Sequence, residues 1–150
     1  MAVLSLTDFS SGEFAIATDK NTSLSSYITD DAIKPFLYEL FGKELADEYL
    51  ADPSASIFDP INTTNYFNYL ISKGVKYYLQ GCVFDKYTND TSIRNLTTGN
   101  AQINNEGSTP IGVKATILYN RSVSTAHAIQ YYCQSNYSNY DGKYICFGGI

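Results

Sequence analysis

The 150-residue chain has little of the chemistry on which most enzyme and metal sites depend. It contains one histidine, one methionine, three cysteines and no tryptophan. The histidine, His127, stands between two alanines, and no cysteine lies at a spacing that would complete a zinc site or a Cys–His pair. The patterns GxGxxG, GxxxxGK(S/T) and GxSxG do not occur. We therefore expect no enzymatic activity, no cofactor and no metal, and interpret His127 as a structural or surface residue.

Further absences indicate the cellular compartment in which the protein is made. The cysteines are odd in number and widely spaced, at Cys82, Cys133 and Cys146, and this pattern argues against a disulfide framework. The first residues, MAVLSLTDFSSGEF, lack the basic segment and long apolar core of a signal peptide. No window resembles the run of roughly 18 or more apolar residues that spans a membrane. The sequence indicates a soluble protein made inside the cell.

Basic residues are scarce and unevenly placed. Ten Lys and Arg against fifteen Asp and Glu give a net charge of −5, which argues against a nucleic-acid-binding surface. Residues 1–60 hold 11 acidic and 3 basic side chains, whereas residues 61–150 hold 4 acidic and 7 basic ones. The two halves could pair between neighbouring copies in a ring or stack, or they could form a solvated surface that keeps the protein soluble. We interpret one acidic cluster as a solvated helical face rather than a cation site: Glu44, Asp47, Glu48 and Asp52.

Tyrosine is what the chain has in excess, with 14 Tyr beside 8 Phe. A tyrosine side chain combines apolar area with a hydrogen-bonding tip, so it suits surfaces that become buried against a partner. It suits a partly hydrated core equally well. With 44% apolar residues, the chain is expected to form one domain over residues 1–150.

The spacing of apolar residues predicts a mainly α-helical fold. Residues 62–90 are expected to form a central helix, in which Gly74 marks a close crossing with another helix. Another helix is predicted from residue 29 or 30 to residue 50, with a break at Gly42. The following loop is expected to anchor Phe58 in the core.

Residues 110–140 are ambiguous, because apolar residues alternate as in a strand over 111–119 but also follow a helical spacing. Their length and Pro110 favour a long helix. The predicted fold is a small bundle of three to four helices with a projecting β-hairpin or extended lobe and a C-terminal arm. We divide it into an N-terminal arm (1–22), a helical core (23–140) with the hairpin at about 91–112, and a C-terminal docking tail (141–150).

This layout resembles the head–tail connector (adaptor or neck) proteins of tailed bacteriophages. The resemblance covers residues 23–140. It rests on the segment ITDDAIKPFLYELFGKELADEYLAD with its Phe41-Gly42, on a long helix, on the Asn/Thr/Gly-rich stretch TTGNAQINNEGSTPIG, and on a final helix ending QYYCQSNYSNY.

The resemblance implies a structural virion protein, assembled in the host cytoplasm, that forms a ring of usually twelve copies beneath the portal protein. Such a ring joins head to tail and extends the DNA channel, through which DNA passes without sequence-specific binding. The partners would be further copies of the chain, the portal protein and a tail or stopper protein, with no membrane. An acidic first half would suit a channel lining, because like charges repel phosphates.

Two segments are predicted to contact partners. The apolar tail is expected to dock either to its own core or to another subunit, where it could add a strand to the neighbour or to the portal. The candidate residues are Asn95, Thr98, Asn104 and Asn105 in the expected hairpin, and Tyr144, Ile145, Phe147 and Ile150 in the tail. Two alternatives stay open. One is another assembly role, in tail completion or as a minor capsid protein. The other is a helical binding domain, or an enzyme whose site assembles from Tyr and Asn residues.

Overall fold

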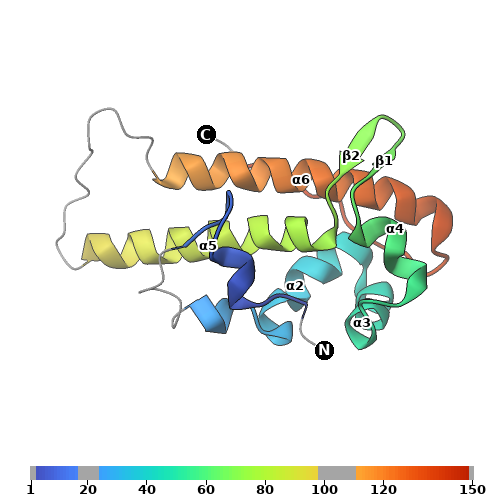
Figure 1. Ribbon diagram of the computed structural model, residues 1–150, viewed down its shortest axis with the longest axis horizontal. Coiled ribbons are helices and arrows are strands. Elements are labelled where there is room, and N and C mark those ends of the chain that lie inside the picture. Colours follow the sequence, from blue (N-terminus) through green and yellow to red (C-terminus); the bar gives the residue numbers. More distant parts are fainter. Residues whose placement is uncertain (1–2, 17–23, 98–110, 149–150) are drawn as a thin grey trace.

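The computed structural model describes residues 3–16, 24–97 and 111–148, with backbone alone at 91–97 and 111–112 (Figure 1). The chain is mainly α-helical with one small β-hairpin, as the sequence predicts. In chain order the elements are η1 (Leu6–Phe9), η3 (Ser25–Tyr27), α2 (Asp30–Phe41), α3 (Lys43–Ala51), η4 (Ser56–Phe58), α4 (Asp59–Asn62), β1 (Asn65–Phe67), β2 (Leu70–Ser72), α5 (Val75–Thr97) and α6 (Ile111–Asn136). An extended tail follows α6.

The elements form layers around the long α5–α6 pair. Figure 1 shows α6 beside α5, with α2 and α3 on the far side of α5 from α6. The hairpin crosses α6 and projects past it, and the C-terminal tail also lies on the α6 side. The core fills the space between these layers and is almost entirely apolar and aromatic.

The helix predicted near residues 29–50 is confirmed, including its break. The Thr29 hydroxyl caps α2 by accepting a hydrogen bond from the Ala32 amide at 3.2 Å. Gly42 separates α2 from α3 with a φ of +83°, a conformation that glycine adopts without strain. A Cβ atom at position 42 would also lie only 2.7 Å from the Asp141 carbonyl oxygen, so the tail packs directly against this break.

The predicted helix over residues 62–90 is wrong in its first part. Residues 65–72 form the antiparallel β1–β2 hairpin, in which Tyr66 pairs with Ile71 and Phe67 with Leu70, and α5 begins only at Val75. The apolar spacing of this stretch reflects the two sides of a hairpin, because Phe67 packs on α6 while Ile71 is exposed. A three-residue strand gives too little alternation to distinguish the two patterns in sequence.

The role predicted for Gly74 belongs to another glycine. Gly74 precedes α5 with a φ of +101°, close to the Asn62 carbonyl, and takes no part in a helix crossing. The close approach is at Gly81 of α5, where an added Cβ atom would lie 2.2 Å from Ser122 Oγ of α6. The absence of a side chain at position 81 therefore lets α5 and α6 pack closely.

The hairpin expected at about residues 91–112 is wrong at both ends. Residues 91–97 belong to α5, and residues 111–112 begin α6. The stretch between them lies outside the described residues. The long helix favoured for residues 110–140 is confirmed as α6, so residues 111–119 are helical.

The segments before the hairpin pack as the sequence predicts. In the N-terminal arm Phe9 and Phe14 are buried, and Gln80 of α5 donates a hydrogen bond to the Asp8 carbonyl at 2.8 Å. Phe58 anchors its loop between the rings of Tyr49 and Tyr137, with centroid distances of 5.0 and 5.9 Å. These contacts attach the arm and the loop to the helical core.

Candidate assembly surface

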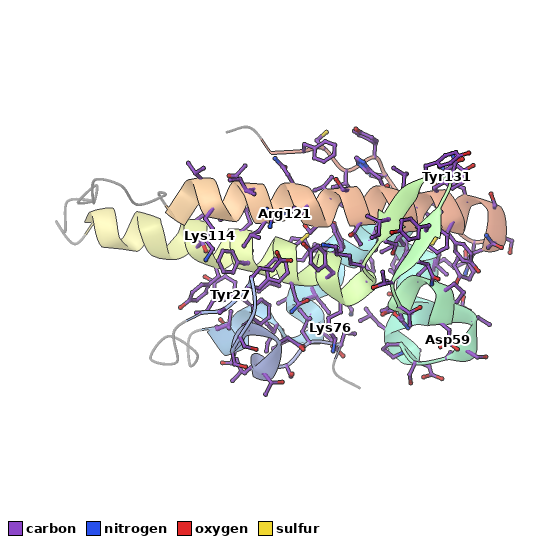
Figure 2. All side chains as sticks on the ribbon, turned by 45° about the horizontal axis from the view of Figure 1, so that its top comes forward. Tyr27, Asp59, Lys76, Lys114, Arg121 and Tyr131 are labelled. Atoms are coloured by element: carbon purple, nitrogen blue, oxygen red, sulfur yellow. The ribbon has the colours of Figure 1, made fainter. Side chains whose placement is uncertain are left out.

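Exposed apolar side chains gather on three neighbouring elements. Among the described residues, eight of the nine large apolar side chains that are exposed come from the hairpin, from α6 or from the tail. We call these eight the aromatic face: Tyr66, Tyr69, Leu70, Ile71, Ile117, Tyr131, Tyr144 and Phe147. Figure 2 shows Tyr131 beside the hairpin. Concentrations of exposed apolar residues of this kind mark interaction sites more often than isolated ones do.

The tip of the hairpin has an unfavourable backbone conformation. The two turn residues, Asn68 and Tyr69, have φ values of +50° and +70°, as in a type I′ turn. Asparagine tolerates this conformation, but the second position normally takes glycine. The Tyr69 side chain is 98% exposed, so contacts within this chain do not offset the strain at its backbone.

The base of the hairpin is firmly held by α6. The ring of Phe67 lies on the ring of Tyr132 at a centroid distance of 4.7 Å. Next to the buried Ser72, the Lys73 amide donates a hydrogen bond to Thr125 Oγ1 at 3.3 Å. The strained tip therefore stands on a rigid support, and the position of Tyr69 relative to α6 is well defined.

The tail is docked on its own chain through backbone hydrogen bonds. The Asp141 amide donates to the Phe41 carbonyl at 2.9 Å, and the Lys143 amide donates to the Glu39 carbonyl at 2.8 Å. The side-chain amide of Gln130 donates to the Lys143 carbonyl at 2.8 Å. The tail thus donates hydrogen bonds to carbonyls at the C-terminal end of α2 that lack partners within the helix, and it accepts one from a side chain of α6.

His127 holds the middle of the tail. Its Nε2 donates to the Ile145 carbonyl at 2.7 Å, while the Ile145 side chain is buried. The imidazole stacks on the Tyr144 ring at 4.9 Å and meets the edge of the Phe147 ring at 5.1 Å. Asn120 fixes the end of the tail by bonding both the amide and the carbonyl of Gly148. The interpretation of His127 as a structural residue is confirmed.

The predicted contact residues therefore have different positions. Tyr144, Ile145 and Phe147 come together around His127, but Ile145 is an internal anchor and only the two aromatic residues are exposed. Asn95 lies in α5 and not in a hairpin. Thr98, Asn104, Asn105 and Ile150 lie outside the described residues.

Sequence reasoning missed the tip of the β1–β2 hairpin. The available signal was Asn68, a residue that favours tight turns, between the short apolar pairs of NYF and LIS. The helical spacing across the same residues concealed it.

A second group of surface side chains is acidic. Six exposed carboxylates lie on α2, α3 and the start of α4, and we call them the acidic face: Asp31, Glu39, Glu44, Glu48, Asp52 and Asp59. Figure 1 places α2 across α5 from α6, whereas α3 and α4 lie beyond the start of α5, towards the C-terminal end of α6. Glu13 of the N-terminal arm and Asp141 of the tail are exposed as well. Asp47 of α3 accepts hydrogen bonds from Lys43 and from the Tyr38 hydroxyl, which hold the pKa of its carboxyl below the usual range.

The basic side chains on the other side accompany the aromatic face. Lys114 and Arg121 lie on α6 (Figure 2), Lys73 follows β2, and Lys143 opens the tail. Arg121 pairs with Glu13 of the N-terminal arm at 3.2 Å. The charge difference between the two halves of the sequence is therefore only partly a difference between two sides of the fold, because Lys34 and Lys43 lie on α2 and α3 and the Lys143 amide bonds to the Glu39 carbonyl.

A wide depression lies between α3 and the end of α6. Its volume is about 520 Å³, within the size range of binding pockets. Its lining residues are Glu44, Glu48, Ile57, Tyr132, Asn136, Tyr137, Ser138 and Asn139. Apolar groups are contributed by Ile57 and the two tyrosines, and the Asn139 side-chain amide donates to Glu48 Oε2 at 2.8 Å.

A second groove, of about 400 Å³, lies between α2, α5 and α6. Its polar lining includes Glu39, Asp85 and Lys86, with Tyr78 and Cys82 beneath them. Partial burial raises the pKa of the Asp85 carboxyl, and burial raises the pKa of the Cys82 thiol, which makes this cysteine a poor nucleophile. Within the described part of the chain, no three His, Cys, Asp or Glu side chains are grouped as metal ligands.

The described helices also include none that is long and apolar enough to cross a membrane. Comparisons with protein-family models, with curated proteins and with solved structures found no match to this chain.

Proposed function

We propose that this protein is a non-enzymatic structural protein of a phage virion that assembles into a ring at the neck. The observation that carries the proposal is the separation of the aromatic face from the acidic face. The aromatic face has Lys73 and Lys114 close to it in the chain, whereas the acidic face gathers six exposed carboxylates on α2, α3 and the start of α4. A surface of each kind on one molecule favours contacts between unlike sides of successive copies.

Contacts between unlike surfaces have a definite consequence for symmetry. They are repeated from copy to copy, and they generate a ring when the rotation between copies closes. The attraction of Lys114 and Lys143 to carboxylates of the next copy would set the register, while the aromatic side chains supply buried apolar area. Tyrosine, the most abundant aromatic residue of the chain, is enriched in such interfaces.

The neck position is supported by the resemblance to head–tail connectors, including the order of the helices. In this proposal the ring lies beneath the portal protein, continues the DNA channel and offers a platform to a tail or stopper protein. Carboxylates that remain exposed towards the channel would repel the phosphates of passing DNA. Twelve copies would match the usual connector ring.

The proposal is tested by mass photometry and negative-stain microscopy of the purified protein, alone and with the portal protein of the same phage. We expect rings, or ordered stacking on the portal. Replacing Tyr131 and Tyr144 by serine should abolish assembly, whereas Lys86→Ser, an exposed change on α5 outside both faces, should leave it intact. A compact monomer at every concentration, with and without the portal, would overturn the proposal.

The same experiment separates the alternatives. Ordered binding to another virion component in place of the portal would favour a role in tail completion or as a minor capsid protein. The groove between α2, α5 and α6 is the feature that would serve a helical binding domain. Its lining makes a small cationic or polar ligand the appropriate class to screen if the protein never assembles.

A further inference from the structure

We infer that Tyr69 at the hairpin tip of one copy inserts into the depression between α3 and α6 of the next copy. This inference rests on the proposed self-assembly and names the contact that links neighbouring copies. It joins two features that the folding of a single chain does not explain. One is a strained and exposed tyrosine, and the other is an open depression with a mixed polar and apolar lining.

The first feature is the residue type at the turn. An Asn-Gly sequence would form this type I′ turn without strain, yet the chain has Asn68 followed by Tyr69. Tyr69 makes the turn less stable and leaves a large aromatic ring 98% exposed. Strained residues that project into solvent tend to occur at functional sites, where a partner uses the side chain.

The second feature is the chemistry of the depression. Ile57, Tyr132 and Tyr137 form apolar walls, and Glu44 and Glu48 supply acceptor oxygens at the rim. A tyrosine ring would fill the apolar part, and its hydroxyl could donate to a carboxylate. Tyr38 of α2 already makes such a bond to Asp47 of α3, at 2.8 Å. The volume of about 520 Å³ accommodates one aromatic side chain together with part of its turn.

The charges of the two partners are complementary. Residues 63–74 comprise the hairpin and its base, and they contain one charged side chain, Lys73. The only charged linings of the depression are Glu44 and Glu48. A second copy of this chain therefore satisfies the depression in shape, hydrogen bonding and charge, and it is the occupant to which the inference commits.

The contact runs in one direction along the ring. The tip and the depression are different surfaces, so each copy gives its hairpin to one neighbour and receives a hairpin from the other. Within one chain, Phe67 of the hairpin lies against Tyr132, which also lines the depression. The inserted Tyr69 would therefore contact Tyr132, which supports the hairpin of the receiving copy, and this contact would align successive copies.

Disulfide trapping tests this contact. In a Cys146→Ser background, which removes the exposed native thiol, Ile57→Cys and Leu70→Cys are combined in one chain, so that Tyr69 itself is kept. Cys82 and Cys133 stay inert because they are buried, and burial raises the pKa of the Cys133 thiol to about 12. Mild oxidation of the assembled protein, followed by non-reducing electrophoresis, should give a ladder of covalent multimers that ends at the ring size.

The single-cysteine variants are the matched controls. Each alone should give no ladder, and an equal mixture of the two should stop at covalent dimers, because each link then uses one copy of each kind. A double variant that also stops at dimers would indicate a reciprocal two-fold contact and overturn the head-to-tail arrangement. A monomer band from protein that is assembled by mass photometry would overturn the inference while leaving the ring in place.

Substitution of Tyr69 gives an independent readout. Tyr69→Gly should restore the favoured Asn-Gly turn and raise the melting temperature, while weakening association at least about 30-fold, as expected for loss of an interface hot spot. Lys86→Ala is the matched control, because alanine is well tolerated in a helix, and it should change neither the melting temperature nor the strength of association. If Tyr69→Gly assembles as tightly as the wild type, the tip is not the inserted group. If protein without these changes is monomeric throughout, the proposed ring fails as well.

Discussion

Gly81 of α5 lies directly against Ser122 of α6, at a place where neither helix can move closer. An added Cβ atom at position 81 would be 2.2 Å from Ser122 Oγ and 2.3 Å from Ser122 Cβ. Rotation of the serine hydroxyl would relieve only the first of these overlaps. The pair therefore sets the spacing of the two longest helices, which carry the hairpin and the tail.

Overpacking at this crossing should destabilise the whole fold. Gly81→Leu is expected to lower the free energy of unfolding by about 3 kcal/mol, measured by urea denaturation. Ser122→Gly in the same chain should recover part of the loss, since it removes one of the clashing groups. Unchanged stability for Gly81→Leu would show that the helices are farther apart than this structure has them.

Loss of the imidazole should release the tail. His127→Ala removes the hydrogen bond to the Ile145 carbonyl and the ring contacts with Tyr144 and Phe147. We expect faster amide hydrogen exchange over residues 141–148 with little change in α5. His127→Gln offers a side-chain donor without the aromatic ring and should protect the tail partly. Equal protection in all three proteins would contradict the anchoring role.

The cysteines should differ sharply in reactivity. Cys146 is exposed, whereas Cys82 and Cys133 are buried, and desolvation raises the pKa of both buried thiols. A thiol-reactive chromogenic disulfide at pH 8 should therefore titrate one thiol in the native protein and three after denaturation. The Cys146→Ser variant should show no fast phase. A fast phase that persists in this variant would mean that the helix pair opens.

Acid should weaken the contacts of Asp47. Hydrogen bonds from Lys43 and Tyr38 lower the pKa of this carboxyl in the folded protein. A lowered folded pKa contributes stability that is present above the unfolded pKa of about 3.9 and is lost as the pH falls through the folded value. Asp47→Asn should thus melt slightly below the wild type at pH 7, and the gap should close as the pH falls through the lowered folded pKa of Asp47. Because this group is at the surface, 0.5 M salt should shrink the gap.

Local signals in the sequence were sufficient to predict an element where a few neighbouring residues set the backbone conformation. Thr29 with the acidic residues after it predicts the start of α2, and Gly42 predicts its break, because capping and glycine conformation act over a few residues. The length and apolar spacing of residues 111–136 likewise identify α6. These features needed no knowledge of distant parts of the chain.

The hairpin could not be predicted in the same way. The stretch from Asn65 to Ser72 fits a helical spacing as well as two short strands, and contact of Phe67 with Tyr132, far along the chain, favours the strands. The crossing glycine was misassigned to Gly74 for a related reason. Which glycine faces another helix depends on the packing angle of α5 and α6, and local spacing does not contain that angle.

The sequence by itself determined a mainly helical chain, an acidic and a basic half, and a small inventory of reactive groups, because composition and local periodicity carry that information. Only the tertiary structure decided that the tail docks on its own α6, that Tyr69 stands exposed at a strained tip, and that aromatic and acidic side chains occupy different sides. Those properties arise from contacts between residues distant in the chain, and their free energies depend on which surfaces the packed helices leave uncovered.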